Sequence, residues 1–76
     1  KIYCITENND LEIGLKLAGC EGITLQDNDN VEEKIDEVVK TNEIGILVVS
    51  KEIYNKAKEK IDGIITNKKL PLVTII

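Results

Sequence analysis

Apolar and polar positions follow two distinct patterns along the chain. Short apolar runs predict strands at residues 1–6, 22–25, 44–49 and 72–76. Apolar residues at helical spacing predict helices at 11–18, from 31 onward and from 51 onward. Strands joined by crossover helices lie parallel with right-handed connections, so the pattern predicts an α/β fold with helices on both faces of the sheet.

The four strands are expected in the order 2-1-3-4, a shortened form of the flavodoxin-like arrangement. Residues 44–49 contain five apolar residues, one glycine and no polar alternation. This is typical of a central strand that is buried on both faces. With 76 residues the chain is long enough for one hydrophobic core and too short for two, so residues 1–76 are interpreted as a single domain.

Polar residues and glycines mark the predicted helix ends. Asn9 or Asp10 is expected to cap the first helix, and Gly19 is expected to end it. Asn30 with Glu33 three residues later is a capping-box pattern that starts the second helix.

The third helix is predicted to run without interruption from a cap at Ser50 to Asn67. Lys68 and Lys69 follow at the negative end of the helix dipole, and Pro71 prevents any continuation. The inner stripe of this helix is expected to consist of Ile53, Tyr54, Ala57, Ile61, Ile64 and Ile65.

The first helix has apolar residues on two sides. Leu11, Leu15 and Ala18 share one face and are expected to point toward the sheet. Ile13 points nearly the opposite way, and Leu17 lies at the flank. Isolated exposed aliphatic residues are common, but these two residues are also candidates for contact with a partner protein.

Charge and composition exclude several classes of function. The net charge is −4, with no arginine and no histidine, which disfavours binding to nucleic acid or to anionic membranes. No apolar run approaches the roughly 20 residues needed to span a bilayer. Cys4 and Cys20 match no metal or redox spacing, and Cys4 is interpreted as a reduced structural thiol. A cytoplasmic protein without a cofactor is therefore expected.

Ligands of open parallel sheets bind where the strand order reverses, here between strands 1 and 3. A phosphoacceptor domain of the response-regulator type would need an aspartate at the end of strand 3, where this chain has Ser50. Lys69 precedes strand 4 instead of following a strand. The residues offered at this point are Glu7, Asn8, Asn9, Asp10, Ser50, Lys51 and Glu52. No catalytic group is expected among them.

Two further patterns are interpreted as structural. Gly14 lies inside a helix and not in a phosphate-binding turn, so it is expected to allow close packing of that helix on the sheet. Asp27 and Asp29 resemble the start of a calcium loop, but Val31 occupies the third ligand position. A turn followed by a helix cap explains this run.

Three motifs in order resemble the F subunit of the V-type and A-type rotary ATPases. They are Ile13-Gly14-Leu15-Lys16-Leu17-Ala18-Gly19-Cys20, the run from Ile44 to Ile53, and Lys69-Leu70-Pro71-Leu72-Val73. The resemblance implies a non-catalytic component of the central stalk that binds the coiled-coil D subunit. It implies a cytoplasmic place peripheral to the membrane, as part of the V1/A1 sector, and contact with the A and B subunits of the head through a C-terminal extension absent from this sequence.

Two other functions remain open from the residues alone. One is a degenerate receiver or small-ligand module that uses Glu7, Asp10, Ser50 and Lys51. The other is a transport-system phosphocarrier that uses Cys4, although Cys4 precedes the end of its strand by two residues. The stalk component is the leading hypothesis.

Overall fold

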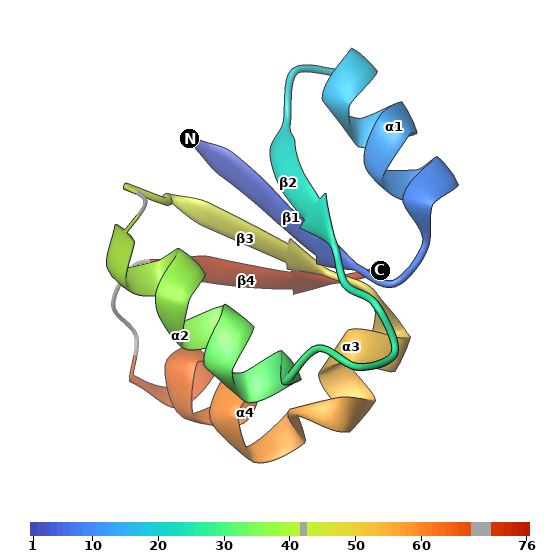
Figure 1. Ribbon diagram of the computed structural model, residues 1–76. Helices are drawn as coiled ribbons and strands as arrows, with labels where there is room; N and C mark the ends of the chain where they lie inside the picture. The colour runs from blue at the N-terminus through green and yellow to red at the C-terminus, as the bar shows by residue number, and fades with distance from the viewer. Residues whose placement is uncertain (42, 68–70) are drawn as a thin grey trace.

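The computed structural model describes residues 1–41, 43–67 and 71–76. Within them the chain alternates between strands and helices (Figure 1). The elements are β1 (Ile2–Thr6), α1 (Asn9–Leu17), β2 (Glu21–Thr24), α2 (Val31–Thr41), β3 (Ile46–Val49), α3 (Lys51–Lys56), α4 (Lys58–Thr66) and β4 (Leu72–Ile75).

The four strands form one parallel sheet in the order β2-β1-β3-β4, so the predicted fold class and strand order are confirmed. Ile5 of β1 pairs with Ile23 of β2 on one side and with Val49 of β3 on the other. β1 and β3 are therefore the central strands, and β2 and β4 are the edges.

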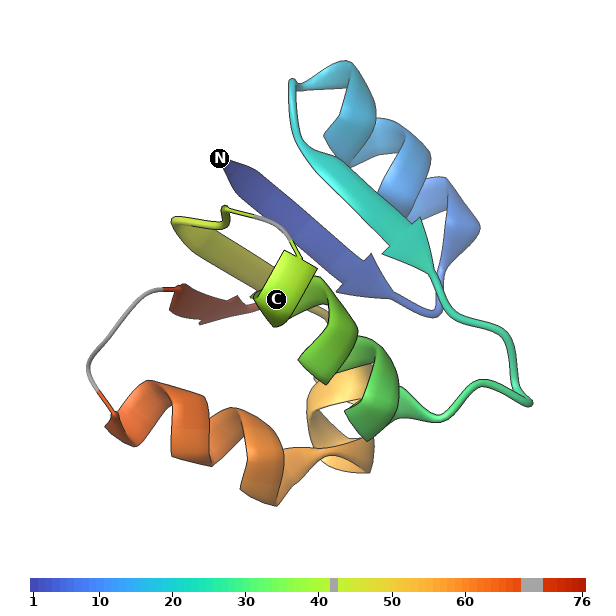
Figure 2. The same cartoon turned by 60° about the vertical axis from the view of Figure 1, so that its left-hand side comes forward.

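Helices cover the two faces of this sheet unequally. α1 lies alone on one face, and α2, α3 and α4 lie on the other (Figures 1 and 2). The core lies between the sheet and the three-helix side. Its buried residues are Ile5, Leu25, Ile35, Val38, Ile44, Leu47, Val49, Ile53, Ala57 and Ile61.

The expectation that strand 3 is buried on both faces is wrong. Leu47 and Val49 are fully buried, whereas Ile46 and Val48 are only half-buried. Successive residues of a strand point to opposite faces, and helices cover β3 well on only one of them. A continuous apolar run therefore did not indicate burial on both sides.

The third helix is interrupted, contrary to the prediction. Ala57, at φ −138° and ψ 41°, separates α3 from α4. The predicted inner stripe is nevertheless largely confirmed, since Ile53, Ala57 and Ile61 are buried and Tyr54 and Ile64 are half-buried. Only Ile65 departs from it, being 45% exposed. Asn67 follows the end of α4, and Lys68 and Lys69 lie outside the described residues.

The first helix begins earlier than expected. Its cap is Asn8, not Asn9 or Asp10, because Asn8 has the extended backbone that a cap requires. The Oδ1 atom of Asn8 accepts hydrogen bonds from the amides of Asp10, at 2.9 Å, and Leu11, at 3.2 Å.

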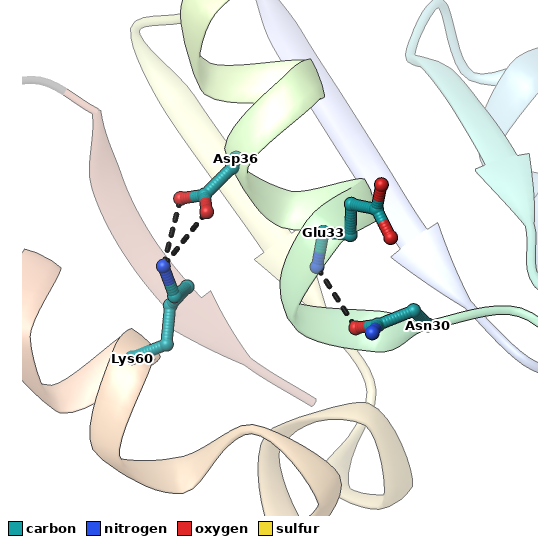
Figure 3. Close-up of polar contacts among 4 residues, drawn as sticks. All are labelled: Asn30, Glu33, Asp36 and Lys60. Atoms are coloured by element: carbon teal, nitrogen blue, oxygen red, sulfur yellow. Dashed lines mark hydrogen bonds and ion pairs between the residues drawn. The ribbon is translucent and has the colours of Figure 1, made fainter.

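The other predicted helix ends are confirmed. Gly19 follows α1 with a φ of 98°, in the left-handed region that favours glycine. Asn30 accepts a hydrogen bond at 3.1 Å from the amide of Glu33 (Figure 3). Ser50 Oγ accepts one at 3.3 Å from the amide of Ile53.

Candidate functional site

The carboxyl ends of β1 and β3 meet where the strand order reverses, and the polar side chains there bind one another. Ser50 is buried, and its hydroxyl donates a hydrogen bond to Glu7 Oε2 at 2.6 Å. Thr6 is also buried, and its Oγ1 accepts a hydrogen bond at 3.0 Å from the amide of Asn8. These groups serve as helix caps and loop contacts, which leaves them satisfied without a ligand.

The four residues proposed for a ligand module do not converge. The structure brings Glu7 and Ser50 together, but Asp10 and Lys51 lie exposed in the first turns of α1 and α3. The amide of Lys51 donates to the carbonyl of Ile76 at 3.1 Å. The geometry therefore gives little support to a binding site at this edge.

Acidic residues do not form a metal site in the part of the chain that the structure describes, where no group of three or more His, Cys, Asp or Glu is placed to hold an ion. Asp29 Oδ2 instead accepts a hydrogen bond at 2.7 Å from the amide of Gln26. The run from Asp27 to Asn30 is thus a turn that leads into a capped helix, as predicted.

Cys4 and Cys20 are free thiols. Cys4 is 1% exposed, and burial together with the nearby Cys20 raises the pKa of its thiol to about 11. A thiol with this pKa is almost fully protonated near neutral pH and is a poor nucleophile. This protonation state argues against the phosphocarrier alternative, which needs Cys4 as its nucleophile.

A shallow groove of about 320 Å³ runs between α2 and α4. Asp36 and Lys60 form an ion pair across it, with Lys60 Nζ at 2.9 and 2.8 Å from the two carboxylate oxygens (Figure 3). Val39 and Ile64 supply apolar surface to its lining. Its lining residues come from α2 and α4 and not from the carboxyl edge of the sheet. Among the described residues, its side chains do not form a cluster of catalytic type.

The inward face of α1 differs from the prediction. Leu11 and Leu15 are half-buried as expected, but Ala18 is exposed and Glu12 is the most buried residue of the helix. Glu12 accepts a hydrogen bond from the hydroxyl of Thr24 on β2 and pairs with Lys16. A carboxylate can occupy this position because both partners compensate its lost hydration.

The glycines of this region also correct the prediction. A Cβ atom on Gly14 would meet nothing within 4 Å, so this residue does not mediate close packing. A Cβ atom on Gly22 would instead lie 2.6 Å from the carbonyl oxygen of Cys4. The close approach therefore occurs between two strands, not between helix and sheet.

Ile13 and Leu17, the candidate partner contacts, both lie on the outer surface of α1. Ile13 is 49% exposed and Leu17 is 86% exposed. The structure thus leaves both side chains available for contact with another protein.

We expect Glu12 to make the stability of the domain depend on pH. The ion pair with Lys16, at 2.5 Å, and the hydrogen bond from Thr24 lower the pKa of Glu12 below its ordinary value. Its contribution is therefore present above the unfolded-state pKa of about 4.3 and is lost as the pH falls through the folded-state value. Glu12→Gln should lower the free energy of unfolding by about 1 kcal/mol at pH 7 and much less near pH 2.

Urea titrations of both proteins at several pH values measure this difference. Glu59→Gln, at an exposed glutamate of α4, is the control and should change little at any pH. An equal loss at pH 7 and pH 2 for Glu12→Gln would show that its carboxylate charge is irrelevant.

No helix in the described ranges combines the length and apolar character that crossing a bilayer requires. A search of curated proteins found no match to the chain. The family model described as "ATP synthase (F/14-kDa) subunit" matches residues 2–76. The chain belongs to this family.

It is thereby an F subunit of the V-type or A-type rotary ATPases, complexes of ATP synthesis and ion transport. The motifs that pointed to this family lie in α1 and its end, in β3 and the start of α3, and, for the described part of the third, at Pro71 and the start of β4. Lys69 and Leu70 of the third motif lie outside the described residues.

Proposed function

We propose that this F subunit is a non-catalytic rotor component of the central stalk. In this role it docks on the coiled-coil D subunit and helps couple ATP hydrolysis or synthesis to ion transport. The observation that carries the proposal is the family match over residues 2–76.

The side-chain chemistry supports a non-catalytic role. Glu7 and Ser50, where a flavodoxin-like enzyme would bind its substrate, are hydrogen-bonded to each other. The raised pKa of Cys4 makes that buried thiol a poor nucleophile. Binding to other components of the complex is then the simplest way for the domain to contribute.

The proposal includes the position of the protein in the complex. A central-stalk protein that lies in the V1/A1 sector, peripheral to the membrane, fits a small acidic domain with exposed aliphatic residues on one helix. Contacts with the A and B subunits of the head are assigned to the C-terminal extension that the family resemblance implies, and not to residues 1–76.

Binding to the D subunit is the direct test. The full-length chain and the D subunit, mixed at micromolar concentration, should migrate as one complex on a sizing column. The double variant Ile13→Glu/Leu17→Glu should bind at least about tenfold more weakly, because charges would enter an apolar contact. Ile65→Glu, at an aliphatic residue 45% exposed on α4, is the control and should bind normally.

Separate migration of the wild-type full-length chain and the D subunit would refute the stalk assignment. The ligand-module alternative is tested by NMR with magnesium and a phosphoryl mimic. The stalk proposal expects unchanged chemical shifts at Glu7, Asp10, Ser50 and Lys51. Specific shifts at these residues would favour the alternative.

A further inference from the structure

The two cysteines lie on the same face of the sheet, the face that α1 covers over β1 and β2 (Figure 1). The hydrogen bond from Thr24 to Glu12 shows that Thr24 points toward α1. Residues two apart on a strand share a face, so Gly22 and its β1 partner Cys4 lie on this side as well. Cys20 directly precedes β2, two residues before Gly22, and continues the same alternation.

Two further observations place the thiols close together. The amide of Cys20 donates a hydrogen bond at 2.9 Å to the carbonyl of Leu15, which holds Cys20 against the end of α1. Burial is the largest cause that raises the pKa of the Cys4 thiol, and the charge of a Cys20 thiolate comes next, ahead of Glu12. An electrostatic effect of this rank requires a short distance between the two sulfur groups.

The strands approach unusually closely beside Cys4. A Cβ atom at Gly22 would lie only 3.0 Å from the Cβ atom of Cys4. Neighbouring strands normally run about 4.8 Å apart. Because glycine has no side chain, nothing at position 22 stands between the thiols of Cys4 and Cys20.

The separation that remains is small. Regular pairing places residues on adjacent strands, offset by two positions, with their Cα atoms about 8 Å apart. A disulfide usually needs Cα atoms within about 4.4–6.8 Å. Cys20 would therefore have to move toward Cys4 by about 1–2 Å.

The chain at Cys20 is able to make this movement. Pairing of β2 with β1 begins one residue later, at Glu21. Gly19 directly precedes Cys20 with a φ of 98°, and a glycine can adopt other backbone angles at little cost. The movement would break the hydrogen bond between Cys20 and Leu15.

The two thiols differ in their access to solvent. Cys20 is half-buried, so a small reagent can reach it, whereas Cys4 is 1% exposed. A partly exposed thiol beside a second, resolving thiol is the arrangement of redox-sensitive cysteine pairs.

We propose that Cys20 and Cys4 form a reversible disulfide when the protein meets a low-molecular-weight disulfide such as oxidised glutathione. Cys20 loses its proton, attacks one sulfur of the reagent and releases the first glutathione thiolate. Cys4 then loses its proton, attacks Cys20 Sγ and releases the second glutathione thiolate. The two thiolates take up the two protons, so two protein thiols are oxidised and one glutathione disulfide is reduced.

The buried position of Cys4 suits the second step. Its burial protects it from the reagent itself, so Cys20 reacts first. Few Cys4 thiols are ionised near neutral pH, which slows the attack on Cys20. Two effects offset this, because a thiolate of high pKa is a stronger nucleophile and a neighbouring group reacts at a high effective concentration.

Peptide mapping of the folded full-length chain after incubation with oxidised glutathione tests the proposal. Trypsin cleaves after lysine, and Lys16 lies between the two cysteines. The disulfide therefore joins the peptides 2–16 and 17–34. This joined pair is expected as the main product of the wild-type chain, and dithiothreitol should separate it again.

Single variants separate the two steps. Cys4→Ala should stop at a glutathione adduct on Cys20, because the resolving thiol is missing. Cys20→Ser should take up no glutathione at Cys4, because that thiol is 1% exposed. The wild-type peptide map decides the proposal even if Cys4→Ala does not fold.

The matched control is the double variant Cys20→Ser/Ala18→Cys, which moves the reactive thiol to an exposed position two residues earlier. It should form the glutathione adduct but not the disulfide with Cys4. Transient unfolding of the chain would oxidise wild type and control equally. Equal disulfide formation in the two proteins would therefore overturn the proposal.

Hydrogen exchange adds a readout of the movement. In the oxidised wild-type chain the amide of Cys20 should exchange at least about tenfold faster, because its bond to Leu15 is broken. Unchanged exchange would show that the disulfide forms without the movement described. A wild-type chain that stays fully reduced, or that stops at the adduct, would overturn the proposal outright. Binding to the D subunit enters none of these outcomes, so the inference stands apart from the proposed function.

Discussion

Replacing Ile61 by alanine is expected to lower the free energy of unfolding by about 2–5 kcal/mol. Ile61 is 0% exposed and packs in the core between the sheet and its helices. Truncation removes buried methyl groups and leaves a cavity that the packed surroundings fill only in part. A domain of this size is stable by about 4–11 kcal/mol, so this loss is a large part of its total stability.

Urea denaturation and thermal melting measure this loss. The melting temperature of Ile61→Ala should fall by about 8–40 °C, given about 4–8 °C for each kcal/mol in small domains. Ile65→Ala is the matched control, since it makes the same change four residues later on α4, where the side chain is 45% exposed. Equal losses for the two variants would contradict the assignment of Ile61 to the core.

Two glycine-to-alanine substitutions are expected to have opposite effects. Gly22→Ala should lower the free energy of unfolding by about 1–3 kcal/mol, the usual cost of overpacking. The new Cβ atom would lie 2.6 Å from the carbonyl oxygen and 3.0 Å from the Cβ atom of Cys4. Since Gly22 and Cys4 are on paired strands, relief requires the backbone of β1 or β2 to move.

Gly14→Ala serves as the control for the same chemical change. It lies inside α1 with open space around its Cα atom, so alanine should raise the free energy of unfolding by about 0.5–1 kcal/mol through helix propensity. Urea titrations of both variants give the comparison. Stabilisation by Gly22→Ala would show that β1 and β2 are not as close as described.

The first helix, α1, shows where a sequence pattern is insufficient. Spacing alone placed Leu11, Leu15 and Ala18 inward and gave no reason to bury a glutamate. Glu12 is buried because α1 sits over Thr24, which donates a hydrogen bond to its carboxylate. That contact joins residues from two elements, so no pattern within α1 could reveal it.

Ala57 illustrates a second cause of error. The apolar residues from 53 to 65 fit one helical stripe, and alanine itself favours helix. The structure breaks the helix at Ala57, although Ile53, Ala57 and Ile61 are all buried as that stripe predicts, and Ile65 is exposed. Backbone propensity therefore gave way to the packing of α3 and α4 on one face of the sheet.

At the candidate site, too, the sequence predicted some features and missed others. The residues at the carboxyl edge, and the exposed positions of Ile13 and Leu17, followed from strand order and helical spacing. The mutual hydrogen bond of Glu7 and Ser50 did not, because it joins residues 43 positions apart in the sequence.

The sequence by itself determined the α/β class, the parallel strand order and the family. Apolar periodicity and ordered motifs can be read directly from the residues, and the right-handed crossover rule then limits the strand order. Only the tertiary structure decided that α1 lies over the β1–β2 half of its sheet face (Figure 1), while Ile46 and Val48 of β3 are half-buried and Leu72 of β4 is 61% exposed. An apolar strand residue has the same sequence signature whether a helix lies above it or not. The burial of a strand residue depends on which part of the sheet each helix packs against, and only the complete fold decides this.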